Sequence, residues 1–120
     1  MKKNKVVCYI KIVDNDEAKV KQQKEQIEKY CLKMNYEIVD YFIDMNSEDS
    51  AIESLFSTYV NSEVHKIIIT DFSTFSNDMA KLYDYCYYAE KFCYLYFETI
   101  KNGVNYDFDI KLLEGVNKYV

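Results

Sequence analysis

Serine hydroxyls and aspartate carboxylates gather in three short polar segments, residues 14–17, 44–50 and 71–77, and each segment follows an apolar run. The last segment lies within "TDFSTFSND", residues 70–78, which comes directly after "KIII". Grouped carboxylates are the ligands that Mg²⁺ prefers, and an activated serine hydroxyl can attack a phosphate. The sequence therefore poses a choice between ion binding, nucleophilic chemistry and a polar loop that has no chemical role.

The basic residues limit which of these reactions is possible. All 15 of them are lysines, so no side chain can offer the planar guanidinium fork that pairs two phosphate oxygens at once. The acidic residues number 20, and the formal net charge is −5. Because this surface on average repels nucleic acid, we expect weak or no DNA binding by this chain on its own.

The segments that must position these residues alternate between strand and helix patterns. Buried-strand patterns cover residues 6–13, 36–44, 65–72 and 92–100, and amphipathic helix patterns cover residues 17–34, 51–60, 77–91 and 108–119. The alternation predicts an α/β domain over residues 1–120, with a three-layer parallel sheet of four or more strands and helices on both faces. Ligands of such sheets bind at the carboxyl ends of the strands, where the three polar segments would meet.

The four cysteines show no spacing typical of metal ligands or of a disulfide framework. Cys8 and Cys93 lie in strand patterns and Cys31 and Cys86 lie on helix faces, so we expect buried free thiols.

No apolar run approaches the roughly 20 residues that span a bilayer, and the apolar run that follows the basic first residues is too short and too charged for a signal peptide. We expect a cytoplasmic protein without membrane contact.

Three stretches, "YIKIV", "EQIEKYCLKMNYEIVDYFID" and "DFSTFSND", together resemble the catalytic domain of serine recombinases, the resolvase and invertase group. That family reads Y-x-R-x-S at its first strand, then a helix with a glutamine, N-G-Y-x-I-V, Asp-Arg-Pro, and S-R-x-S-R after a further strand. The resemblance covers residues 5–97 and implies a resolvase-like fold. It also implies DNA strand exchange through a phosphoserine link, without cofactor or metal, in which arginines neutralise the phosphoryl transition state.

The chain departs from that pattern at the positions that carry the chemistry. The nucleophilic serine falls on Val13, which cannot attack phosphate, and the arginine of the same motif falls on Lys11. The arginine before the second helix falls near Asp49, and the two arginines after the third strand fall on Thr74 and Asn77. The full set of vestigial positions is Lys11, Val13, Gln26, Asp49, Ser73, Thr74 and Asn77. We therefore expect no catalytic residues.

Some residue types of the family remain, namely Gln26, Asp44, Ser73 and Ser76. Ser47, Ser73 or Ser76 could in principle replace the missing nucleophile. Each would face a strand-end edge that we expect to carry the carboxylates of Asp14, Asp16, Asp44, Asp49, Asp71 and Asp78. Like charge at that edge opposes the approach of a DNA phosphate, so a substitute nucleophile is disfavoured.

A second resemblance gives an alternative function. "IKIVDNDEAKVKQQKEQIEKY" is similar to the opening of response-regulator receiver domains, which implies weak Mg²⁺ candidates at Asp14 and Asp16 and a phosphoacceptor at Asp71. The usual Pro and Gly after the acceptor are absent, and Lys101 is the one candidate for the lysine of a fifth strand. The simpler interpretation of Asp14 and Asp16 is helix capping, which the helix dipole favours.

Aromatic residues indicate protein contacts. Tyr85 and Tyr88 lie in a tyrosine-rich stretch without a basic groove, which favours a protein interface over base stacking. Residues 106–120 resemble the start of the helix that carries the recombinase dimer contact, with interface candidates Phe108, Leu112, Val116 and Tyr119. We expect a recombinase-like pseudoenzyme that binds a protein partner or forms a homo-oligomer. A residual role in DNA recombination beside a partner recombinase is the remaining alternative.

Overall fold

The computed structural model describes residues 3–46, 48–70 and 79–100, with only the backbone of 79–83. The chain forms β1 (Asn4–Ile12), α1 (Glu17–Met34), β2 (Tyr36–Met45), α2 (Ser50–Tyr59) and β3 (Lys66–Ile69). α4 (Met79–Tyr88), the π-helical turn η1 (Ala89–Cys93) and β4 (Tyr96–Thr99) follow. The predicted alternation of strands and helices is confirmed over this part of the chain.

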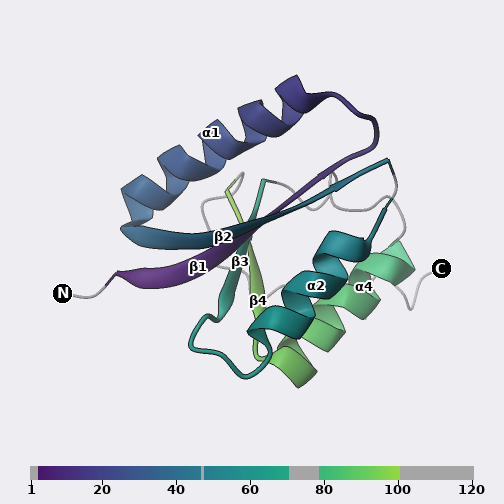
Figure 1. The fold of residues 1–120 in the computed structure, drawn as a ribbon. Coiled ribbons are helices and arrows are strands. Elements are labelled where there is room, and N and C mark those ends of the chain that lie inside the picture. The colour runs from purple at the N-terminus through teal and green to yellow at the C-terminus, as the bar shows by residue number, and fades with distance from the viewer. Residues whose placement is uncertain (1–2, 47, 71–78, 101–120) are drawn as a thin grey trace.

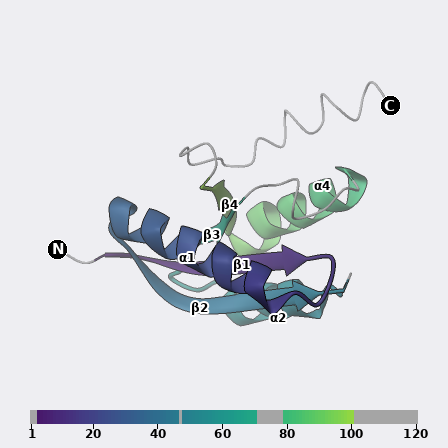
Figure 2. The same ribbon diagram turned by 90° about the horizontal axis from the view of Figure 1, so that it is seen from above.

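The four strands form one parallel sheet in the order β2-β1-β3-β4. Helix α1 runs alongside β1 and β2 on one face, while α2 and α4 lie together on the other face (Figures 1 and 2). The predicted three-layer architecture with helices on both faces is therefore confirmed. The polar segments after β1 and β2 begin at the carboxyl ends of neighbouring strands, as the sequence predicts.

Each strand divides its side chains between two cores because successive residues point to opposite faces. On β1, Val6, Cys8 and Ile10 pack under α1 with Ile27 and Cys31. The opposite core lies under α2 and α4 and holds Val7, Tyr9, Ile52, Leu55, Phe56, Ile67, Cys86, Ala89 and Phe97. Burial on both faces explains why β1 and β3 read as continuous apolar runs rather than alternating ones.

Helix α1 is capped at both ends, by Asp16 before its first residue and by Asn35 after its last. The Asp16 carboxylate accepts a hydrogen bond of 3.0 Å from the Ala18 amide, and Asn35 ends the helix in a left-handed conformation with φ 61°. Met34, which the helical pattern places on the buried face, is the last residue of α1 and is 38% exposed. Val20, Ile27 and Cys31 are buried as expected.

The fourth strand begins later than the sequence pattern predicts. Residues 92 and 93 belong to η1, and Tyr94 then takes a left-handed conformation with φ 57° before β4 begins at Tyr96. The aromatic residues of this stretch have high strand propensity, but η1 extends α4 instead and buries Ala89 and Cys93 in the core. Cys93 is thus in a helical turn rather than in a strand, although all four cysteines are buried and free as predicted.

Strand β2 forms one edge of the sheet and spans 10 residues. Its pairing with β1 shifts by one residue between Val6 and Val7, which is the signature of a β-bulge. Glu37, Val39 and Asp40 are exposed along this strand.

In the described residues, no helix is both long and apolar enough to cross a membrane.

Candidate functional site

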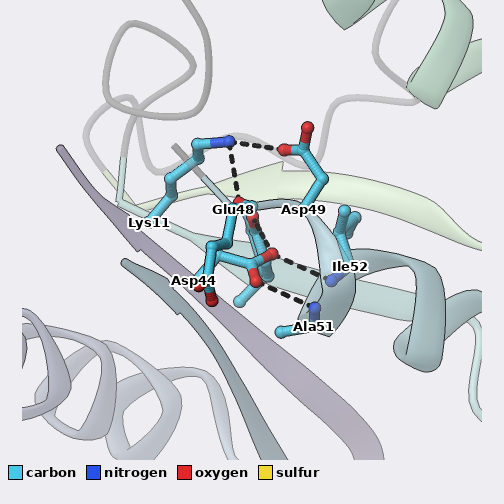
Figure 3. A network of polar contacts seen from close by, with 7 residues as sticks. Lys11, Asp44, Glu48, Asp49, Ala51 and Ile52 are labelled. Carbon is cyan, nitrogen blue, oxygen red and sulfur yellow. Dashed lines mark hydrogen bonds and ion pairs between the residues drawn. The ribbon is translucent and has the colours of Figure 1, made fainter. Parts of the chain in front are cut away.

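Lys11 and Asp49 form an ion pair at the carboxyl ends of β1 and β2. The Lys11 ammonium lies 2.6 Å from the Asp49 carboxylate and 3.3 Å from the carbonyl oxygen of Glu48 (Figure 3). Only 12% of the Lys11 side chain and 21% of the Asp49 side chain are exposed. The lysine that stands where the family has an arginine is therefore neutralised within the chain.

Asp44, at the end of β2, is turned inward and holds the start of α2. Its carboxylate accepts hydrogen bonds of 2.8 Å from the Ala51 amide and 3.0 Å from the Ile52 amide (Figure 3). The Tyr9 hydroxyl donates a third bond of 2.8 Å to the same carboxylate. These two amides belong to the first turn of α2, whose amide groups have no partner within the helix.

The arrangement explains how Asp49 is available to Lys11. Asp49 occupies the N-cap position of α2, but its side chain makes no capping hydrogen bond because Asp44 already binds the first amides. The expectation that Asp44 adds its charge to an open strand-end edge is wrong. Asp44 is 1% exposed, and three hydrogen bonds satisfy its carboxylate inside the protein.

Asp14 and Asp16 organise the turn between β1 and α1. Asp14 accepts from the Asp16 amide at 3.1 Å and from the Lys19 ammonium at 2.8 Å, and the hydrogen bond to Lys19 is the main reason why the pKa of Asp14 lies below its usual value. Asp16 caps α1. Within the described ranges no group of three or more His, Cys, Asp or Glu side chains could hold a metal ion. Both acids thus make the contacts expected of turn and cap residues.

Val13 and Gln26 occupy very different places relative to this edge. Val13 directly follows β1 beside Asp14 and is 71% exposed, so the position of the family's nucleophile carries an apolar side chain in contact with solvent. Gln26 is exposed on α1. Since a helix rises 1.5 Å per residue, Gln26 lies about 14 Å along the axis from the start of α1 at the strand-end edge. Gln26 therefore lies along α1 at a distance from the ion pair of Lys11 and Asp49.

The other predicted positions divide between a surface groove and undescribed segments. Tyr85 and Tyr88 both line a groove between α2 and α4. The remaining candidates lie outside the described residues: Ser47, Asp71, Ser73, Thr74, Ser76, Asn77, Asp78, Lys101, Phe108, Leu112, Val116 and Tyr119.

Sequence reasoning missed a second buried carboxylate, Glu98 of β4. The residue is fully buried, and it accepts hydrogen bonds from Tyr30 at 2.5 Å and Tyr36 at 3.1 Å. The Lys66 ammonium lies 3.2 Å from the Glu98 carboxylate, and it also donates to the Tyr36 hydroxyl at 2.9 Å. Burial and the hydrogen bond to Glu98 raise the pKa of Tyr30. The one sequence feature that could have indicated a buried carboxylate was the position of Glu98 within the apolar run of residues 95–100.

The described geometry defines a parallel α/β domain whose strand-end lysine and acids contact one another. No protein-family model matches the sequence, and no curated protein matches it significantly. Solved structures do match. The N-terminal catalytic domain of TP901-1 integrase is similar with a TM-score of 0.78 and 15% identity, over 97% of this chain and 96% of that one.

Two further structures show the same likeness. A resolvase family site-specific recombinase from Streptococcus pneumoniae has a TM-score of 0.77 and 16% identity, over 98% of this chain and 87% of that one. The C-terminal catalytic domain of ISC1926 TnpA, an IS607-like serine recombinase, has a TM-score of 0.64 and 15% identity, over 96% and 97% of the two chains. The chain therefore has the fold of serine recombinase catalytic domains, as the sequence resemblance predicted.

Proposed function

We propose that this chain is a recombinase-like domain that does not cleave DNA and that acts by binding another protein or further copies of itself. The observation that carries the proposal is the ion pair between Lys11 and Asp49. A phosphoryl transition state needs positive charge aimed at its equatorial oxygens. Here the ammonium group at the expected position is already bound to a carboxylate at 2.6 Å and to a carbonyl oxygen.

Two further observations support the proposal. Val13, at the position of the nucleophilic serine, supplies no attacking oxygen. The whole sequence contains no arginine, so the bidentate pairing with phosphate that the family resemblance implies has no source within this chain. The net charge of −5 opposes the approach of DNA in addition.

Incubation of the purified chain with supercoiled plasmid tests the first half of the proposal. The reaction is stopped with detergent, and covalent protein–DNA adducts and relaxed or nicked plasmid are measured on gels, with an active serine recombinase on its own site as the positive control. We expect neither adduct nor relaxation. An adduct that a Ser→Ala substitution at position 47, 73 or 76 removes would contradict the proposal and identify the nucleophile.

Sedimentation velocity over a concentration series, together with crosslinking and mass spectrometry in the native cell, tests the second half. We expect either concentration-dependent self-association or one reproducibly crosslinked protein partner. A chain that stays monomeric at every concentration and crosslinks to no protein would contradict a role in protein binding.

A further inference from the structure

Aromatic and acidic side chains line a groove between α2 and α4. Phe56, Tyr85 and Tyr88 line it together with Ser57, and it encloses about 400 Å³. Glu53 contributes a carboxylate from α2, and Asp84 contributes one from α4. The two helices lie next to each other on the face of the sheet opposite α1 (Figure 1). The described lining of the groove does not include Lys11 or Asp49, although Glu53 lies one helical turn after Asp49.

The aromatic rings of this surface form a continuous band. The Phe56 ring centroid lies 6.1 Å from that of Tyr85 and 5.4 Å from that of Tyr88. Tyr88 in turn stacks on Phe92 of η1, with centroids 5.4 Å apart. Tyr88 is 47% exposed and Phe92 is 58% exposed. A contiguous exposed aromatic surface of this kind marks an interaction site, whereas isolated exposed apolar residues do not.

The negative charge of the groove favours a partner with basic side chains. Its described lining has two carboxylates and no basic side chain, and α2 contains no lysine. Helix α4 contains Lys81, whose side chain lies outside the described part of the chain. Carboxylates repel phosphate, which disfavours a nucleic acid. The negative faces of aromatic rings attract cations, and the methylene stem of a lysine or arginine packs well on such rings. One basic side chain can therefore pack on the aromatic rings and form an ion pair with the carboxylates.

We propose that this groove binds a basic amphipathic segment of a partner protein, with an arginine or lysine lying over the exposed ring of Tyr88 and paired with Glu53 and Asp84. The proposal deepens the proposed function, because it names the surface and the chemistry of the protein contact. A second copy of this chain is a poorer occupant, since each copy carries a net charge of −5 and no arginine.

The probe is a fluorescein-labelled helical peptide of about four turns, with leucines along one stripe and two arginines beside them. Matched peptides carry glutamine or glutamate in place of both arginines. Fluorescence anisotropy with the full chain gives each Kd at low and at moderate salt. We expect the arginine peptide to bind at least about tenfold more tightly than the glutamine peptide, which corresponds to about 1.4 kcal/mol. The preference should shrink as salt increases.

Charge-reversal variants locate the site. Asp84→Lys and Glu53→Lys should each weaken binding of the arginine peptide by about tenfold or more. Glu25→Lys, an equal change of charge at an exposed position of α1 on the opposite layer, should leave the Kd unchanged. Circular dichroism and urea midpoints confirm that each variant is folded. Tyr88→Ala removes the stacking surface without a change of charge and should also weaken binding.

Equal affinity for the arginine and glutamine peptides, or an equal loss with Glu25→Lys, would overturn the proposal. A concentration-dependent dimer that Phe92→Glu abolishes would overturn it in favour of a second copy on the same face. The plasmid experiment is independent of these results. A DNA adduct combined with selective peptide binding would refute the inactive-enzyme proposal alone, whereas no adduct and no peptide binding would refute the groove alone.

Discussion

The Tyr9 hydroxyl donates a hydrogen bond of 2.8 Å to the Asp44 carboxylate, and both side chains are buried. The contact joins β1 to the end of β2, while the same carboxylate also receives two amides of α2. One acidic side chain thus fixes three elements around the strand-end edge. Burial and then the hydrogen bond to Asp44 raise the pKa of Tyr9, so this hydroxyl remains a donor across the physiological range.

Loss of the Tyr9 hydroxyl should destabilise the fold measurably. We expect Tyr9→Phe to lower the free energy of unfolding by about 1–3 kcal/mol, because a buried carboxylate loses a donor without gaining water. Urea denaturation followed by circular dichroism measures the change. Tyr94→Phe, at a tyrosine that is 56% exposed, is the matched control and should change stability by less than about 0.5 kcal/mol. Equal effects of the two substitutions would contradict the role of the contact.

Removal of the Asp49 charge should release Lys11 toward solvent anions. We expect Asp49→Asn to bind a short DNA duplex more tightly than Glu25→Gln, an equal change of net charge on α1. One freed lysine adds roughly one phosphate contact, so the slope of log K against log salt should steepen by about 0.9. Anisotropy of a labelled duplex over a salt series gives both quantities. Identical slopes for the two variants would show that the ion pair with Asp49 does not prevent Lys11 from contacting a DNA phosphate.

The contacts of Glu98 predict a loss of stability at alkaline pH. Burial raises the pKa of both Tyr30 and Tyr36, and hydrogen bonds to Tyr36 and Glu98 raise the pKa of Lys66 despite its partial desolvation. In an unfolded chain tyrosine and lysine lose their protons near pH 10. Because the native state holds these protons to higher pH, it binds more protons than the unfolded state above about pH 10. The free energy of unfolding should therefore fall as pH rises there.

Tyr30→Phe separates this contribution from that of other groups. Without the hydroxyl, the variant should show a shallower fall between pH 9.5 and 11, although it is less stable at neutral pH. Urea titrations at a series of pH values measure both effects. A variant whose pH dependence parallels that of the native chain would exclude Tyr30 as a source of the alkaline transition.

Tyr94 should be a site of easily gained stability. Its φ of 57° costs a residue with a Cβ atom roughly 1 kcal/mol, which glycine avoids. We expect Tyr94→Gly to raise the free energy of unfolding by about 0.5–1 kcal/mol after the greater entropy of glycine in the unfolded chain is included. Tyr94→Ala keeps the Cβ atom and should give no such gain. Thermal denaturation of the pair provides the comparison, and an equal gain for both would refute backbone strain as the cause.

The fold could be predicted because its signals are local. Strand β1 reads as a continuous apolar run, and α1 has apolar residues at helical spacing between an Asp N-cap and an Asn C-cap. The start of β4 could not be predicted in this way. Phe92 and Cys93 have the same strand-like character as the residues that follow. Their helical conformation goes with tertiary contacts, because Cys93 is buried in the core and Phe92 stacks on Tyr88.

The site was predicted in part. Asp14, Asp16, Lys11 and Asp49 lie near the strand ends as their places in the sequence suggest. The inward turn of Asp44 depends on where α2 places its first amides, which is a property of the tertiary structure. Gln26 was assigned from its place in the family pattern, and the direction of α1 places it along the helix away from the strand-end edge. The burial of Glu98 depends on Tyr30 and Lys66, which are distant in sequence.

The long outer strand β2 has a consequence for how copies of this protein can meet. An uncovered strand offers its backbone amides and carbonyls to another chain, which is the usual route to fibrils. Here the register shift opposite Val6 and Val7 interrupts a regular ladder, and the exposed Glu37 and Asp40 would bring like charges together in any edge-to-edge stack. Sheet extension from one molecule to the next is therefore disfavoured, and helical surfaces are left to support assembly of finite size.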